Sequence, residues 1–336
     1  GFFTHKRVTW FMPYNLSIHS YMQVLKVLMP QKLIQPSTRE YIREARQMKD
    51  FSFFDLLHGY LYARFPYFYI AMGTGQHPLA KRLAPLVAWI GSFMVKHAGK
   101  SASSSAVKFE DTYHGKVVPL QAARQLVSVH EPVDLPNLEH IVPYAKARDI
   151  ILKNPDHIAV MDCPCRTARE HPCLPLDVCL VVGEPFASFV VEHNPQKARM
   201  ITSEEAQAIL KAEDERGHVH HAFFKDAMLG RFYAICNCCT CCCAALQAQR
   251  KGTPMLASSG YVAQIDANLC AACGNCVETC LFDALTLDDI ASVDVERCMG
   301  CGVCLGQCPA DAIALTRMQS KGAPLEIETL MQAAAR

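Results

Sequence analysis

The sequence of 336 residues predicts an α+β protein built from three parts. The first part places apolar residues at helical spacing, the middle part alternates helical segments with short buried strands, and the last part holds two dense runs of cysteine. We place these parts at residues 1–116, 117–256 and 257–336. They correspond to a helical docking region, a small α/β cysteine-rich metal-binding domain, and a cysteine-run domain with a C-terminal tail.

The N-terminal part is expected to consist of packing helices. Ser37 and Glu40 have the spacing of a capping box, so a helix should begin there. The aromatic stretch 51–73 is too polar, and the apolar stretch 83–95 too short, for a membrane span. An interfacial helix or a partner-binding surface is the alternative for both stretches. Small, serine-rich residues predict a linker or mobile loop at 98–107.

The middle part is expected to alternate helices and strands. Helices are predicted at 119–129, at 138–152, and from a capping box at Thr202 to a point before Gly217. Apolar runs predict buried strands at 157–163, 177–183 and 232–236. The first strand runs into CPCR, which begins at Cys163, and the third into CNCCTCCC, which begins at Cys236. Because ligands gather at the carboxyl ends of strands in α/β sheets, the two turns should face one pocket if these strands are neighbours.

Two cysteine runs near the C-terminus share the order C-x2-C-x2-C-x3-C. The first is CAACGNCVETC and the second is CMGCGVCLGQC. Thiolates at this spacing hold 4Fe–4S clusters, and the fourth cysteine of each run serves the cluster of the other run. We therefore predict two clusters, one held by Cys270, Cys273, Cys276 and Cys308 and the other by Cys298, Cys301, Cys304 and Cys280.

Over about residues 261–316 the chain resembles a bacterial-type two-cluster ferredoxin module. This resemblance implies a C-terminal two-cluster ferredoxin-like domain. Gly274, Gly300 and Gly302 suit the tight loops that such a module needs. Leu281 stands where the family usually has proline, which concerns the loop and not the ligands. A pair of zinc sites is the alternative, but the doubled spacing favours clusters.

A broader resemblance covers roughly residues 51–316. The CPCR turn, the VCLVVG strand, the CNCCTCCC run and the ferredoxin-like end follow one another as in bacterial and archaeal 4Fe–4S dicluster-domain iron–sulfur proteins. HGYLYARFPYFYI at 58–70 also looks similar to the upstream region of those proteins. The resemblance implies electron transfer but supplies no substrate.

Ten further cysteines in the middle part indicate metal ligation. They are Cys163, Cys165, Cys173, Cys179, Cys236, Cys238, Cys239, Cys241, Cys242 and Cys243. At least one more centre is expected: one 4Fe–4S cluster in the simplest case, with two clusters or a zinc site as alternatives. Cysteine also packs well in cores, so two to four are expected to be structural, with Cys173 and Cys179 as candidates. In a helical turn, Cys238, Cys241 and Cys242 would share one face, and Cys239 and Cys243 another.

Arg166 and His220 are the candidate residues that contact a cofactor without ligating it. Arg166 follows the CPCR cysteines and could donate to cluster sulfides, with pairing to an acidic side chain as the alternative. His220 precedes the CNCC run and would share one strand face with His218, where a proton-donor or ligand role is conceivable. A surface or hydrogen-bonded histidine is the alternative.

Charge is unevenly distributed along the chain, although the net charge is only +1. Residues 1–110 hold 14 lysines and arginines against 5 acidic residues, which leaves +9. Residues 260–336 hold 4 against 10, which leaves −6. The basic part suits an acidic protein or an anionic membrane face, and the acidic part suits basic patches on redox partners. Two solvated surfaces of opposite sign are the alternative.

The 18 cysteines and the absence of a secretory signal pattern favour a reducing compartment. We expect a cytoplasmic protein that can contact a membrane peripherally, without a transmembrane span. No phosphate-binding or dinucleotide-binding motif appears, and no nucleic-acid surface is expected around the clusters.

Together these patterns predict an iron–sulfur electron-transfer protein of anaerobic metabolism. It would pass single electrons through two ferredoxin-type clusters and at least one further centre, to or from a larger oxidoreductase or membrane complex. The alternative is a reductase whose CPCR/CNCC centre is catalytic and is fed by the ferredoxin module. The sequence leaves open whether the chain is itself an enzyme, and favours a component of an oxidoreductase system. A metal-dependent structural or sensing module is a third possibility.

Overall fold

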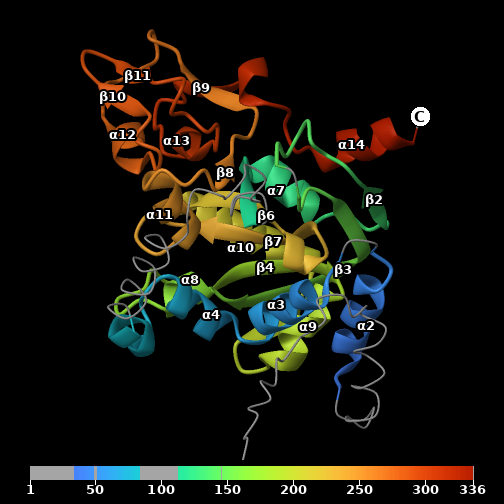
Figure 1. Cartoon of the computed structure of the whole chain (residues 1–336). Helices are drawn as coiled ribbons and strands as arrows, with labels where there is room; N and C mark the ends of the chain where they lie inside the picture. Colours follow the sequence, from blue (N-terminus) through green and yellow to red (C-terminus); the bar gives the residue numbers. More distant parts are fainter. Residues whose placement is uncertain (1–33, 49–50, 84–112, 145, 336) are drawn as a thin grey trace, which may run out of the picture.

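The computed structural model describes residues 34–48, 51–83, 113–144 and 146–335 (Figure 1). The linker predicted at 98–107 and all but the first residue of the stretch 83–95 lie outside the described residues.

An eight-stranded sheet forms the centre of the molecule, in the order β2-β3-β4-β7-β6-β1-β8, with β5 paired to β3. Its strands are β1 (Tyr113–Val118), β2 (Val133–Leu135), β3 (Ile150–Asp162), β4 (Asp177–Glu184), β5 (Ala198–Ile201), β6 (Val219–Lys225), β7 (Arg231–Cys238) and β8 (Leu256–Ala257). Each pairing is antiparallel except that of β1 with β8. The mixture of this sheet with helices confirms the predicted α+β class.

The three strands predicted from apolar runs are confirmed as β3, β4 and β7. The predicted helix at 138–152 is wrong, because these residues form turns followed by the start of β3. Pro143 lacks a backbone donor and would break such a helix. Ile150 instead pairs with Leu135 of β2. The helix predicted at 119–129 is present as α7 (Leu120–Leu126).

Helices cover both faces of the sheet (Figure 1). One face carries α2 (Pro36–Ala45), α3 (Phe53–Arg64), α4 (Pro66–Gly73), α9 (Phe186–His193) and α11 (Ala244–Arg250), with η2 (Asp226–Met228) beside α3. The other face carries α7, α10 (Ser203–Glu215) and α14 (Ile327–Ala334). The short α8 (Pro164–Thr167) follows β3 and contacts α4. Buried apolar side chains therefore form one core on each side of the sheet.

The two predicted capping boxes have different outcomes. Thr202 caps α10, since its hydroxyl accepts a hydrogen bond from the Glu205 amide at 3.2 Å. The capping box predicted at Ser37 is wrong, because α2 begins one residue earlier, at Pro36, and has no side-chain cap. A proline at the first helical position needs no capping partner. Ser37 instead donates hydrogen bonds to Glu192 of α9.

The stretch 51–73 forms two packing helices, α3 and α4, separated at Pro66. Neither is long enough for a bilayer. More generally, none of the helices that the structure describes combines the length and apolar character that a membrane span requires.

The C-terminal module contains two copies of a small unit, each with a cysteine run and a short helix. Strand β9 (Tyr261–Ile265) pairs with β12 (Ile313–Arg317), and β10 (Leu285–Leu287) pairs with β11 (Ala291–Val293). Helices α12 (Asn275–Thr279) and α13 (Val303–Gly306) each follow a glycine with positive φ, Gly274 at 80° and Gly302 at 88°. After η3 (Gln319–Lys321), the tail returns to α7 and β2 through α14. The predicted boundaries at 116/117 and 256/257 fall within β1 and β8.

Candidate metal centres

Two cavities in the C-terminal module are each lined by four cysteines. The first contains Cys270, Cys273, Cys276 and Cys308. The second contains Cys280, Cys298, Cys301 and Cys304. Each cavity thus takes three cysteines from one run and one from the other. The structure therefore brings together the same two groups of four cysteines that the sequence spacing predicted. That they hold clusters stays a prediction.

Backbone amides point at the thiols of both quartets, which we call the first cage and the second cage. The amide of Ala284 donates to Cys280 Sγ at 3.3 Å, and the amide of Ala312 donates to Cys308 Sγ at 3.3 Å. The two contacts occupy equivalent places in the repeat. Such N–H···S hydrogen bonds stabilise the charge of a thiolate and tune a cluster that it holds.

Burial differs between the two cages. Burial raises the pKa of the Cys301 thiol, and raises the pKa of Cys304 to about 12. In the first cage, Cys273 is exposed at the surface. The second cage is therefore the more buried of the two, and a metal must supply the charge that favours its thiolates.

The second cage lies on the side of the module that faces the middle domain. Cys301, Met299 and Val303 pack against the same core cluster as Cys238 and Cys243. Across this boundary, Gln307 Nε2 donates to Glu215 O at 3.3 Å, and Arg250 Nη2 donates to Leu281 O at 3.0 Å. The thiols of the second cage and those of the middle domain are thus joined through one continuous core.

The CPCR and CNCC turns lie at the same end of the central sheet. Strands β3 and β7 both run antiparallel to β4, which lies between them, so β3 and β7 are parallel to each other and their carboxyl ends lie at that end. Eight of the ten cysteines between Cys163 and Cys243 line a single cavity there. The condition of the prediction, that β3 and β7 are neighbours, is wrong because β4 lies between them, but both turns still line one cavity.

The ten middle-domain thiols divide into two sets. The six-thiol set comprises Cys163, Cys165, Cys179, Cys236, Cys238 and Cys243. In this set Cys163 hydrogen-bonds to the thiols of Cys165 and Cys179, which lowers the pKa of Cys163. Cys179 also contacts Cys236, and Cys243 lies 3.2 Å from Cys238.

The four-thiol set comprises Cys173, Cys239, Cys241 and Cys242. Their sulfur atoms all lie within 4.8 Å of one another. Cys241 Sγ lies 2.8 Å from Cys173 Sγ, 3.4 Å from Cys239 Sγ and 3.6 Å from Cys242 Sγ. Cys173 thus contacts other thiols, which favours ligation over a packing role. Cys179 is part of the buried core and also contacts the thiols of Cys163 and Cys236, so both roles stay open for it.

The predicted faces of the CNCCTCCC run are wrong. Cys238 ends β7, the next residues form a turn, and α11 begins only at Ala244. Cys238 consequently points toward Cys243, whereas Cys239, Cys241 and Cys242 gather with Cys173. A tight turn reverses the chain, so adjacent cysteines serve two different groups.

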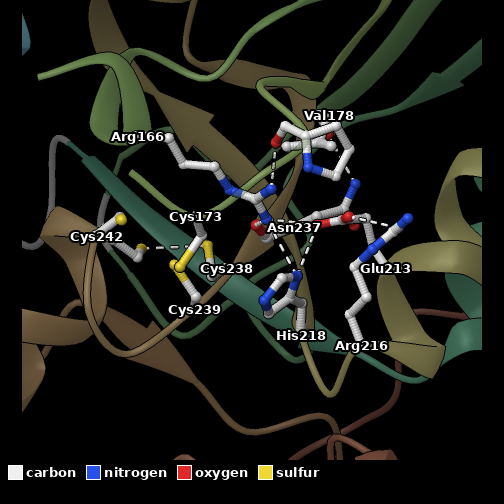
Figure 2. A network of polar contacts seen from close by, with 12 residues as sticks. Arg166, Cys173, Val178, Glu213, Arg216, His218, Asn237, Cys238, Cys239 and Cys242 are labelled. Carbon is white, nitrogen blue, oxygen red and sulfur yellow. Dashed lines mark hydrogen bonds and ion pairs between the residues drawn. The ribbon is translucent and has the colours of Figure 1, made fainter. Parts of the chain in front are cut away.

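Arg166 is the centre of a buried polar network (Figure 2). It forms an ion pair with Glu213, and donates to Pro175 O at 2.5 Å and to Asn237 O at 3.1 Å. The acidic partner proposed as the alternative for Arg166 is therefore present. Its Nε is also buried, makes no hydrogen bond to the described residues, and belongs to a side chain that lines the thiol cavity.

Glu213 holds this network to α10. It accepts hydrogen bonds from Arg216 at 3.0 Å and lies 2.7 Å from His218 Nδ1. Burial acts to raise the pKa of Glu213, but the hydrogen bond to His218 and the charge of Arg166 outweigh it and hold that pKa below its usual value. The carboxylate is therefore the charged partner that Arg166 needs.

His220 lies behind the cavity rather than in its lining. Its Nδ1 is 2.6 Å from Asn237 Oδ1, and its Nε2 is 3.6 Å from Asp214 Oδ1. Asn237 in turn donates to Val178 O at 2.7 Å. This geometry supports the hydrogen-bonded alternative for His220. Strand β6 begins at Val219, so His218 lies just outside it.

Three tyrosines in the cavity were not predicted from the sequence. Tyr62, Tyr113 and Tyr233 line the wall beside the six-thiol set. The hydroxyls of Tyr62 and Tyr233 lie 2.7 Å apart, and burial raises the pKa of both residues. Lys225 Nζ stands 5.1 Å from the rings of Tyr62 and Tyr113. The dense aromatic content of 51–73 was the available signal, but it did not reveal a cavity.

Comparison with known proteins identifies one family segment. The family described as 4Fe-4S binding domain (Fer4) matches residues 291–314, which contain the second cysteine run. No curated protein and no solved structure matches the chain. The match and the many cysteines give the chain the features of an iron–sulfur electron-transfer protein, with a 4Fe–4S binding domain and a second, cysteine-rich region able to bind metal.

Proposed function

We propose that the chain passes single electrons through two 4Fe–4S clusters in the C-terminal module and at least one further centre in the middle domain. The observation that carries this proposal is the pair of four-cysteine cavities, each assembled from both runs. A cubane needs four thiolates on four different irons, and the crossed arrangement supplies them twice.

The protein residues would hold each cluster, insulate it and set its potential. The amides of Ala284 and Ala312 donate to ligand sulfurs and favour the more negative, reduced state. The apolar surroundings of Cys301 oppose added negative charge and act in the other direction. The two cages are thus expected to differ in potential.

The further iron–sulfur centre is assigned to the six-thiol set. These thiols lie at one end of the central sheet, and Cys238 and Cys243 share a core cluster with Cys301 of the second cage. The resulting order is first cage, second cage, six-thiol set. The first cage would exchange electrons with the redox partner, since Cys273 and Leu269 are exposed there. A larger oxidoreductase with a basic docking patch fits the acidic module.

The crossed ligation can be tested with pairs of alanine variants in the full chain, purified without oxygen. Cys270→Ala/Cys308→Ala is expected to remove one cluster, so about four irons and four sulfides are lost. Cys298→Ala/Cys308→Ala is expected to remove both clusters. Iron and acid-labile sulfide analysis, together with reduced-state EPR, measures these losses. The opposite pattern would show that each run holds its own cluster and would contradict the proposal.

A reductase is the second candidate function, and the residues that line the thiol cavity favour it. The six-thiol set offers two more thiols than a cubane takes, and it adjoins a wall of apolar side chains and tyrosines that could receive a small substrate. Mössbauer spectroscopy of the middle-domain cluster separates the two functions. Four equivalent thiolate-bound irons support a wire, whereas one iron without a thiolate supports a catalytic centre.

A further inference from the structure

We propose that the four-thiol set binds a single tetrahedral metal ion, with Zn²⁺ as the ion that fits best. This inference deepens the proposal of further metal centres in the middle domain. It does not depend on the clusters of the C-terminal module, which can be counted separately in the same sample.

The distances between the sulfur atoms decide the type of centre. Zn–S bonds of about 2.3 Å in a tetrahedron place the sulfurs roughly 3.8 Å apart. Cys239 and Cys242 lie 3.4 and 3.6 Å from Cys241, close to that edge length. Cys173 lies 2.8 Å from Cys241, shorter than that edge, so its sulfur would move away from Cys241 when the ion binds. A cubane binds each thiolate to a different iron, so it would require these sulfurs to move apart, as it would the contacting pairs of the six-thiol set. The four-thiol set differs in that all its members lie within 4.8 Å of one another, which suits one ion.

The same chain provides an internal comparison. Among the residues that the structure describes, this is the set whose ligand atoms gather within 4.8 Å of one another. The first and second cages each surround a cavity with four cysteines without meeting that limit. Cysteines placed for cubanes are thus spread around a space, whereas the four-thiol set is already contracted to the size of a single ion.

The local chain explains how four ligands meet. Cys239, Cys241 and Cys242 come from the turn between β7 and α11. Cys173 comes from the segment between α8 and β4, which is tied to the sheet where the Cys163 amide donates to Leu176 O at 2.7 Å. An ion at this point would connect the two cysteine-bearing turns. It would also close the segment containing Cys173 over the six-thiol set.

Two arginines offset the negative charge of such a site. Four thiolates around a divalent ion carry a net charge of about −2, which a partly buried position tolerates poorly without cations. Arg169 Nη2 donates to Cys242 O at 3.2 Å, and the positive charge of Arg166 acts on the Cys173 thiol. The Nε atoms of Arg166 and Arg169 are both buried without a hydrogen-bond partner among the described residues.

Coordination by four protein thiols indicates a structural ion rather than an electron carrier. Cys241 is exposed and Cys173 is half-buried, whereas Cys239 and Cys242 are buried. All four coordination positions are taken by protein, which is the arrangement of closed structural zinc sites. The ion would therefore hold the two turns in place and leave electron transfer to the cubanes.

The experiment compares Cys241→Ala with Cys273→Ala, a matched exchange of an exposed cysteine in the first cage. The full chain is purified anaerobically, and its zinc, iron and acid-labile sulfide are measured. Wild type is expected to hold one zinc per chain, with four sulfur neighbours at about 2.3 Å by X-ray absorption. Cys241→Ala is expected to lose that ion and keep all its sulfide. Cys273→Ala is expected to keep the ion and lose about four sulfides.

Each remaining outcome has a defined meaning. Loss of one iron without sulfide in Cys241→Ala would support a mononuclear site that holds iron instead of zinc. Loss of about four irons and four sulfides together would identify a cubane and overturn the inference. An unchanged metal content, or a Cys173–Cys241 disulfide found by mass spectrometry in the native chain, would also overturn it. Retained ferredoxin signals in these samples would leave the proposed electron transfer intact.

Discussion

At the scale of single residues, Gly300 shows how closely the backbone surrounds the second cage. Its φ is +63°, and a Cβ there would lie 2.1 Å from Tyr261 O and 2.4 Å from Ser259 Oγ. Gly300→Ala is expected to lower the free energy of unfolding by about 3 kcal/mol or more, because left-handed strain adds to a clash with backbone. It should also lower the cluster content of the second cage, measured as iron and sulfide per chain.

Gly252 provides the matched control for that prediction. It has a similar φ of +88°, but no atom lies within 4 Å of the position of its Cβ. Gly252→Ala should therefore cost only about 1 kcal/mol from backbone strain, with full cluster content. Equal losses of stability in the two variants, measured by chemical denaturation, would show that the close approach at Gly300 has no energetic role.

At the scale of elements, His193 connects three helices on one face of the sheet. From α9, its Nε2 lies 2.7 Å from Thr38 Oγ1 of α2, and its Nδ1 contacts Arg64 of α3. Burial and the charge of Arg64 lower the pKa of His193 to about 4. The imidazole is consequently neutral in the folded protein over a range in which the unfolded chain is protonated.

This shift predicts a pH dependence of stability. Between about pH 6.5 and pH 4 the unfolded chain binds a proton at His193 that the folded chain does not, so stability falls as the pH falls. The decrease from this group is at most about 1.4 kcal/mol per pH unit. His193→Gln should flatten the slope of unfolding free energy against pH. Thr38→Val, which removes the same hydrogen bond but no titrating group, should lower stability and keep the slope. Parallel slopes for wild type and His193→Gln would contradict this account.

The elements also show which features a sequence pattern can predict. The strands β3, β4 and β7 follow continuous apolar runs, and such runs report burial directly. The helix expected at 138–152 failed because its apolar spacing was compatible with a helix while Pro143 was not. Cys238 points toward Cys243 because the chain turns back between β7 and α11. The spacing of apolar residues along the sequence does not predict the direction of that turn. The partition into a six-thiol and a four-thiol set required coordinates.

At the scale of the whole molecule, the three predicted parts share contacts that their sequences do not reveal. Helices α3 and α4 from the N-terminal part close the thiol cavity through Tyr62, Ala63, Pro66 and Ile70. The tail after the C-terminal module returns to the sheet, where Lys116 Nζ donates to Ala323 O at 2.8 Å. Long-range contacts of this kind depend on packing, and local spacing carries no signal for them. The cysteine quartets were predictable because ligation imposes a fixed spacing on a short segment.

The arrangement of cages, six-thiol set and four-thiol set rests on the claim that these sulfur atoms hold metal. Anomalous diffraction from anaerobic crystals of the full chain, recorded at the iron and zinc edges, tests that claim directly. We predict one group of four irons inside each cage, an iron group beside the six-thiol set, and a single zinc peak among Cys173, Cys239, Cys241 and Cys242. An iron map without density inside the two cages would contradict the account.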